Sequence, residues 1–66
     1  MIVKVRKISP WEWEVEINGK KYSIIEEEPF EEGYIYLING DWGRIFDAFE
    51  DAFESLIQSE AEDEEN

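Results

Sequence analysis

The sequence predicts an α+β domain, a four-stranded antiparallel meander sheet followed by one C-terminal helix packed on one face. Three observations predict this fold. Residues 11–17 alternate apolar and acidic side chains, Asn18-Gly19 is the pair most typical of a tight hairpin turn, and residues 42–57 repeat apolar side chains every three or four positions. A chain of 66 residues is long enough for one compact domain, which we expect over residues 1–59.

The first three strands are expected over residues 2–8, 11–17 and 20–26. A two-residue turn at Asn18-Gly19 pairs Val15 with Tyr22. A two-residue loop before the second strand would turn Lys4 and Arg6 toward the core. A loop with an odd number of residues instead pairs Val5 with Val15 and sets both cations opposite the glutamates of the second strand, so we expect the odd loop and a largely neutralised strand.

Residues 26–33 combine five glutamates with a proline and a glycine, which is typical of a loop. A short fourth strand is expected over residues 34–38. The connection is too short for a crossover helix, so this strand returns antiparallel to the third.

The helix is expected to run from Asp41, as its N-cap, to Gln58 or Ser59. Its apolar stripe, which is expected to pack on the sheet, consists of Trp42, Ile45, Phe46, Phe49, Phe53, Leu56 and Ile57. Residues 60–66 carry no apolar face, and this composition predicts a disordered acidic tail.

Charge is separated along the chain, which has 18 acidic residues, six basic residues and a formal net charge of −12. Residues 1–25 hold five basic and three acidic residues, residues 26–40 hold five acids and no base, and residues 41–66 hold ten acids and Arg44. Such a surface repels nucleic acid and anionic membranes and attracts basic proteins. We therefore expect a basic nucleic-acid-binding protein or enzyme as the partner, with no direct binding of nucleic acid or membrane.

Catalysis and metal binding find little support in the sequence. The chain has no histidine or cysteine, which removes the usual general base and the strongest nucleophile. Its acidic runs lack the alternating spacing and pivot glycine of a calcium loop, and its glycines form no phosphate-binding motif. We expect no enzyme activity, no metal site and no cofactor. The absence of cysteine and of a recognisable signal segment predicts a cytoplasmic protein.

Surface recognition is the function that remains. Four carboxylates of the predicted helix follow i, i+3, i+4, i+7 spacing and form one outward stripe, namely Asp47, Glu50, Asp51 and Glu54. The predicted acidic loop adds Glu26, Glu27, Glu28, Glu31 and Glu32. Phe30 and Tyr34 are expected to act as apolar anchors beside these glutamates.

In composition and size, the chain resembles phage-encoded nucleic-acid mimics, among them inhibitors of uracil-DNA glycosylase, restriction enzymes and CRISPR effectors. The resemblance covers charge and length only. It implies an acidic anti-defence inhibitor that presents carboxylates in place of nucleic-acid phosphates and occludes the basic groove of a nucleic-acid enzyme.

Two other classes of function compete with this hypothesis. One is an immunity protein that neutralises a basic nuclease toxin. The other is a regulatory or assembly domain that binds a protein, or a second copy of itself, through an apolar strip on the uncovered sheet face. That strip is expected to contain Ile8, Ile25 and either Tyr34 with Tyr36 or Ile35 with Leu37.

Overall fold

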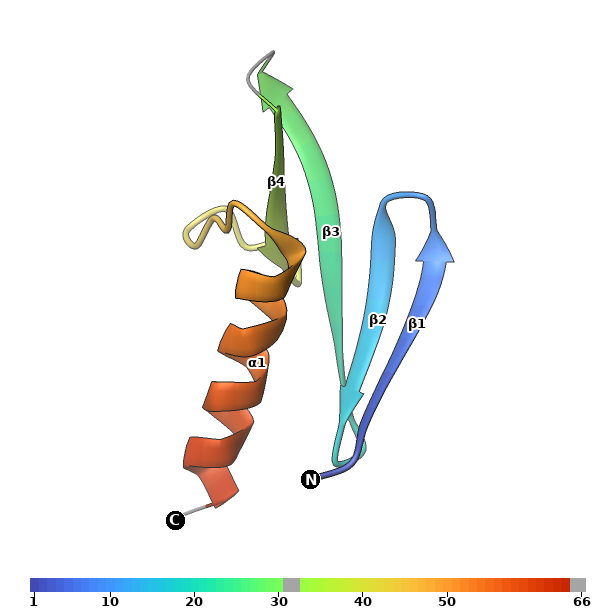
Figure 1. Ribbon diagram of the computed structural model, residues 1–66, viewed down its shortest axis with the longest axis vertical. Coiled ribbons are helices and arrows are strands. Elements are labelled where there is room, and N and C mark those ends of the chain that lie inside the picture. The colour runs from blue at the N-terminus through green and yellow to red at the C-terminus, as the bar shows by residue number, and fades with distance from the viewer. Residues whose placement is uncertain (31–32, 65–66) are drawn as a thin grey trace.

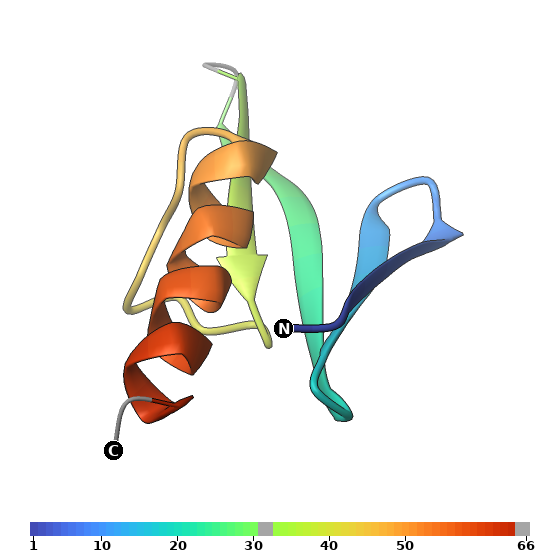
Figure 2. The same cartoon turned by 60° about the horizontal axis from the view of Figure 1, so that its bottom comes forward.

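The computed structural model describes residues 1–30 and 33–64 and contains the predicted sheet and helix (Figure 1). The helix α1 spans Phe49–Glu64. The strands form one antiparallel sheet in chain order and are β1 (Val3–Ser9), β2 (Glu12–Ile17), β3 (Lys20–Phe30) and β4 (Gly33–Ile38). Figures 1 and 2 both show α1 beside β3 and β4, with β1 at the far edge of the sheet. The predicted ββββα fold is confirmed.

The hairpin of β2 and β3 has the predicted turn and register. Asn18 and Gly19 have φ angles of 50° and 86°, the left-handed values that a type I′ turn requires. Val15 pairs with Tyr22 across this hairpin and with Val5 on β1. The odd spacing between β1 and β2 is therefore confirmed, and it comes with a register shift after Lys7.

Strand β3 is longer than the sequence predicted, because residues 26–30 continue the strand instead of forming a loop. Glu26 pairs with Tyr36 on β4, and the Tyr36 hydroxyl donates a hydrogen bond of 2.8 Å to Glu26 Oε2. The register shifts between Glu27 and Phe30, a stretch that includes Pro29, which has no N–H to donate to the ladder. Pairing with β4 thus outweighs the local preference of these residues for a loop.

The helix begins seven residues later than predicted, at Phe49 instead of Trp42, and Asp41 is not its N-cap. Asp41 Oδ1 instead accepts a hydrogen bond of 2.8 Å from the Gly43 amide in a local turn. Phe46 then pairs with Tyr36 through two backbone hydrogen bonds of 2.9 and 3.1 Å. These bonds satisfy the outer edge of β4, which a helix over the same residues would leave unpaired.

The core lies between α1 and one face of the sheet. Its buried side chains are Val15, Ile17 and Ile24 from the strands and Ala52 and Leu56 from the helix. Burial of each larger aliphatic side chain contributes about 1.5–3 kcal/mol to the hydrophobic driving force. A group of aromatic rings, with centroids 5.1–6.3 Å apart, extends this core and contains Trp13, Tyr36, Phe49 and Phe53.

The helix also ends later than predicted, at Glu64, so residues 60–64 are helical and not part of a disordered tail. Residues 65–66 lie outside the described part of the chain. Glu60 is 4% exposed and occupies the next position of the stripe that includes Phe49, Leu56 and Ile57. Its carboxylate accepts a hydrogen bond from the Tyr22 hydroxyl, so a polar contact replaces the apolar packing that the prediction required at this position.

The expected exposed apolar strip is incomplete, because Ile8 is 52% exposed but the other aliphatic members are not. Ile25 and Ile35 are only partly exposed, and Leu37 is 1% exposed. Leu37 pairs with Ile25 on β3, and its neighbour Tyr36 forms an antiparallel bridge with Phe46. Phe46 therefore lies along the edge of β4, which the sequence did not predict.

Candidate functional site

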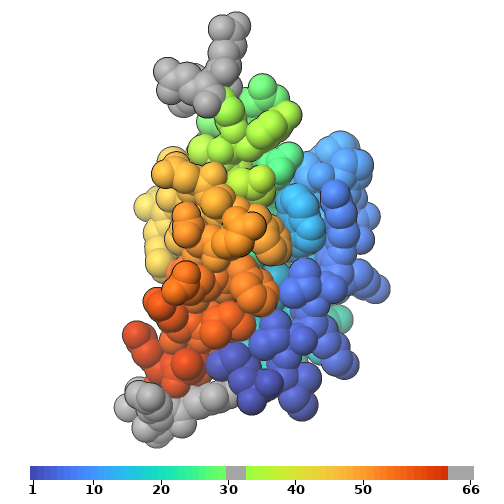
Figure 3. Space-filling model, viewed as in Figure 1, coloured from blue at the N-terminus to red at the C-terminus, as the bar shows by residue number. Residues whose placement is uncertain are grey.

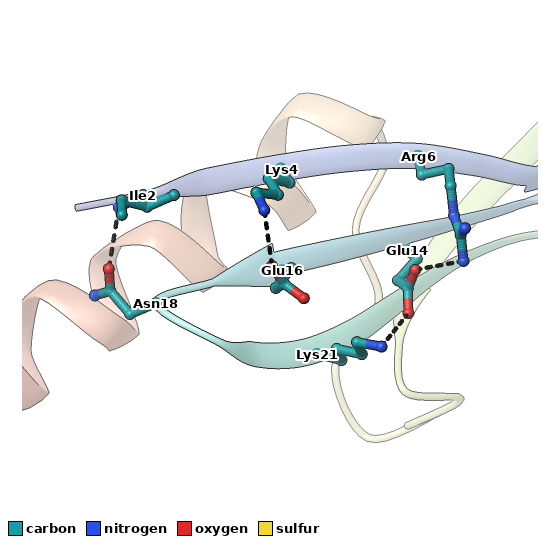
Figure 4. Close-up of polar contacts among 7 residues, drawn as sticks. All are labelled: Ile2, Lys4, Arg6, Glu14, Glu16, Asn18 and Lys21. Atoms are coloured by element: carbon teal, nitrogen blue, oxygen red, sulfur yellow. Dashed lines mark hydrogen bonds and ion pairs between the residues drawn. The ribbon is translucent and has the colours of Figure 1, made fainter.

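Most basic side chains of the described chain lie on β1 and on the β2–β3 hairpin, where they pair with glutamates (Figure 4). Arg6 Nη2 donates to Glu14 Oε2 at 2.9 Å, and Lys21 Nζ lies 3.9 Å from Glu14 Oε1. Lys4 Nζ lies 3.8 Å from Glu16 Oε2. The predicted neutralisation of Glu14 and Glu16 on β2 is confirmed, so these two carboxylates are poor candidates for a binding surface.

Lys7 and Arg44 interact with aromatic rings. Lys7 Nζ lies 5.1 Å from the ring centroid of Trp13, and the Arg44 guanidinium lies 5.5 Å from that of Phe46. Arg44 Nη2 also donates a hydrogen bond of 2.9 Å to Ser55 Oγ. Within residues 1–30 and 33–64, no ion pair reaches the acids on β3 or those on the first two turns of α1.

Three of the four predicted helix carboxylates lie on α1. Glu50, Asp51 and Glu54 are exposed and follow the spacing of one outward stripe. Glu50 and Asp51 occupy the first turn, where the helix dipole favours negative charge, whereas Glu50 and Glu54 repel each other across one turn. These carboxylates therefore destabilise the helix less than they would if they lay in the middle of it.

Asp47 is not part of the helical stripe as predicted. It is exposed but lies two residues before Phe49, next to Ala48, whose carbonyl accepts the first hydrogen bonds of α1 from the amides of Asp51 and Ala52. The late start of the helix is the reason. Asp47 therefore adds negative charge near the helix N-terminus without a fixed place in the i, i+3, i+4 pattern.

Of the predicted loop glutamates, Glu26, Glu27 and Glu28 lie on the second half of β3. Glu27 and Glu28 are exposed and Glu26 is partly buried. Glu31 and Glu32 lie outside the described residues, as does the side chain of Phe30, whose backbone pairs with Gly33. In Figure 3, the green end of β3 and β4 lies above the orange start of α1, and the blue strand β1 lies at the right.

An open hollow of about 420 Å³ borders these glutamates. It is lined by Pro10, Trp11, Glu26, Glu27, Glu28 and Tyr34. Trp11 is 57% exposed and Tyr34 is 56% exposed. The Glu26 amide donates a hydrogen bond of 2.8 Å to the Trp11 carbonyl, which attaches the turn before β2 to β3. The structure thus brings Tyr34, a predicted anchor, together with Trp11, which was expected on the buried face of a strand.

Tyr36, on β4, lies near negatively charged side chains of both β3 and α1. The hydrogen bond from its hydroxyl to Glu26 is the largest cause that raises the pKa of Tyr36, and burial and the negative charges of Glu26 and Glu50 raise it further. One phenol therefore senses a carboxylate from the strand and another from the helix. Among the acidic residues, these influences on Tyr36 come from Glu26 and Glu50.

Sequence reasoning missed two groups that the structure places at defined positions. Glu60 was assigned to a tail, although it continues the i, i+3, i+4, i+7 spacing of the helix and that spacing was the available signal. Trp11 was included as an apolar position of the alternating strand predicted over residues 11–17. Its neighbour Pro10 was the available signal for a turn, at which strand alternation ends.

The described residues contain no group of three or more acidic side chains arranged to hold a metal ion. In the part of the chain that the structure describes, no helix is both long and apolar enough to cross a membrane. No protein-family model, curated protein or solved structure matches this chain.

Proposed function

We propose that this protein is a stoichiometric inhibitor that binds a basic protein and presents carboxylates in place of nucleic-acid phosphates. Its partner is a nucleic-acid-binding enzyme, and binding occludes the positive groove that holds DNA or RNA. The acidic surface is defined as Glu26, Glu27, Glu28, Asp47, Glu50, Asp51 and Glu54.

The observation that carries this proposal is the separation of paired from unpaired acids. Arg6 and Lys21 form ion pairs with Glu14, and Lys4 forms one with Glu16. The charges of these two glutamates are therefore balanced within the sheet. In the described residues, the acidic surface has no such ion pairs. Its charge is left available for a partner.

Electrostatics makes such a surface suitable for fast recognition of a basic groove. Unpaired charges act over a Debye length of about 8 Å at physiological salt and accelerate association with an oppositely charged partner. A helix rises about 1.5 Å per residue, so Glu50 and Glu54 are about 6 Å apart along the axis. This separation is of the same order as that between successive phosphates on a nucleic-acid strand.

Competition with nucleic acid tests the proposal. The immobilised protein is incubated with lysate from the host or its virus, and the captured protein is then challenged with duplex DNA and with RNA. We expect the captured protein to bind nucleic acid by itself and to be released by it. The variant D47K/E50K/D51K/E54K is expected to lose this capture, because its helix surface is positive.

A neutral variant, D47N/E50Q/D51N/E54Q, separates the effect of charge from that of shape and is expected to bind with intermediate strength. A partner that binds the protein and its nucleic acid at the same time would contradict occlusion. Unchanged capture by the reversed variant would exclude α1 from the interface.

A second candidate function has one observation in its favour. Val3, Val5 and Ile8 are exposed on β1, an edge strand without a neighbour on its outer side in the described sheet. Exposed apolar edges favour assembly. Sedimentation at low and high salt distinguishes the two functions, because salt weakens an electrostatic complex and leaves an apolar assembly largely intact.

A further inference from the structure

The hollow between Trp11 and Tyr34 is lined by two exposed aromatic rings and by three glutamates. Each aromatic side chain is more than half exposed, although rings of this size normally bury much of their surface. Glu26, Glu27 and Glu28 complete the lining. Carboxylates alone attract any cation, whereas the two rings and the concave shape add a place for one planar or apolar group.

Two hydrogen bonds hold the walls of this hollow together. The Glu26 amide donates to the Trp11 carbonyl at 2.8 Å, and the Tyr36 hydroxyl donates to Glu26 Oε2 at 2.8 Å. Both bonds involve Glu26, so this residue fixes the turn before β2 against β3 and β4. The hollow is built into the fold, which lowers the entropic cost of binding a ligand there.

The chemistry of the lining favours an aliphatic or guanidinium cation. The faces of tryptophan and tyrosine attract cations, and the exposed carboxylates of Glu27 and Glu28 add Coulombic attraction. None of the described residues that line the hollow is basic. A guanidinium fits best, because its plane stacks on aromatic rings while its edge donates two parallel hydrogen bonds to a carboxylate.

We propose that this hollow receives the guanidinium of an arginine side chain from a protein partner. The inference rests on the proposed function in one respect, that the partner is basic. It adds a defined contact beside the acidic helix, and the contact supplies specificity that the long-range attraction of the carboxylates lacks.

A peptide titration tests the site without knowledge of the partner. The ¹⁵N-labelled protein is titrated with acetyl-Gly-Arg-Gly-amide and with the same peptide containing citrulline, a neutral analogue of nearly the same shape. We expect the arginine peptide to shift the Trp11 indole resonance and the amides of Glu27 and Glu28, and the citrulline peptide to bind roughly tenfold more weakly or not at all. Equal shifts by the two peptides would overturn the proposal.

A third peptide, with lysine in place of arginine, tests the preference for a guanidinium. Weaker shifts with lysine support stacking of the guanidinium on the rings. Equal shifts with lysine would overturn the assignment to arginine, because they would show that only the positive charge is recognised.

Trp11→Leu is the main variant, and Trp42→Leu is its matched control because Trp42 is similarly exposed and does not line the hollow. Leucine keeps an apolar side chain but removes the aromatic face, so W11L is expected to weaken the arginine peptide about two- to fivefold while W42L leaves it unchanged. Equal losses in both variants would overturn the proposal. The amide spectrum of each variant checks folding, and E27Q/E28Q tests the site without changing a ring.

The outcomes separate this inference from the proposed function. If the arginine peptide does not bind the parent protein and W11L still captures a nucleic-acid enzyme normally, the arginine site is removed and phosphate mimicry is left intact. Selective peptide binding without competition from nucleic acid would keep the site and remove the mimicry.

Discussion

Lys20 Nζ lies 3.6 Å from Glu60 Oε2, which joins the start of β3 to the last turns of α1. The other oxygen of Glu60 accepts the hydrogen bond from Tyr22. Glu60 is buried, whereas Lys20 is largely exposed, so the carboxylate depends on these two groups for most of its polar contacts. The pair closes the end of the core that the apolar side chains of the helix do not cover.

Glu60→Ala is therefore expected to destabilise the protein by about 1–3 kcal/mol, because it leaves the partly buried hydroxyl of Tyr22 without this acceptor. Urea unfolding followed by tryptophan fluorescence measures the change. Glu54→Ala is the control, since it removes the same charge from an exposed position of the helix and is expected to change stability by less than about 0.5 kcal/mol. Similar losses in both variants would contradict a structural role for Glu60.

Asn18 and Asn39 make the same pair of contacts at two different turns. Each has a positive φ, 50° for Asn18 and 53° for Asn39. The Asn18 amide donates to the Ile2 carbonyl and its Oδ1 accepts from the Ile2 amide at 3.0 Å. Asn39 makes the equivalent two bonds with Ser23, both at 2.9 Å. Each asparagine side chain thus adds one hydrogen bond at the end of a strand pair.

We expect Asn39→Ala to cost about 1–2 kcal/mol, because alanine loses the side-chain hydrogen bond and is strained at positive φ. Asn39→Gly removes only the hydrogen bond and is expected to cost less. Thermal unfolding of both variants, with Asn18→Ala and Asn18→Gly as a second pair, measures the difference. A larger loss for glycine than for alanine at both sites would refute the role of backbone strain.

The raised pKa of Tyr36 predicts a loss of stability in alkaline solution. The unfolded chain releases this proton near the ordinary tyrosine pKa of 10.0, and the folded protein releases it at higher pH. The stabilisation is therefore complete below pH 10 and disappears as the pH rises through the folded pKa. Tyr36→Phe is expected to cost about 0.5–1.5 kcal/mol at neutral pH and to lose this part of the alkaline dependence.

Unfolding free energies between neutral and strongly alkaline pH provide the measurement. Tyr34→Phe is the control, because it removes an exposed phenol and keeps the contact between Tyr36 and Glu26. The control should retain most of the alkaline loss of the parent protein, because Tyr34 is the smallest of the causes that raise the pKa of Tyr36. If Tyr36→Phe retains it equally, the hydrogen bond to Glu26 is not its source.

Short-range patterns predicted much of this fold. The alternation in β2 and the Asn18-Gly19 turn fix the register of their hairpin, because both act over a few residues and agree on which face is buried. The register of β1 followed from charge pairing, which the contact between Arg6 and Glu14 confirms.

The errors occurred where contacts distant in sequence decide the structure. Phe46 fits an apolar helical stripe, yet it pairs with Tyr36 because the edge of β4 is available to it. The local sequence predicts that Glu26 lies in a loop. In the folded protein, Glu26 instead pairs with β4 and accepts a hydrogen bond from the Tyr36 hydroxyl. The hollow beside Trp11 depends on the same long-range pairing, so the candidate site was predicted only as a set of carboxylates.

The acidic surface is expected to oppose stability while it supports binding. With a net charge of −12, the folded protein concentrates like charges that the unfolded chain spreads apart, so added salt should raise the unfolding temperature. Glu27→Gln and Glu28→Gln remove two exposed, adjacent charges, and each is expected to stabilise the protein by roughly 0.2–0.5 kcal/mol at low salt.

Capture of the basic partner should weaken in the same variants, as a stability–activity trade-off requires. Thermal unfolding at two salt concentrations, measured beside the capture experiment, decides the outcome. Unchanged stability together with unchanged capture would assign these glutamates to an ordinary hydrated surface.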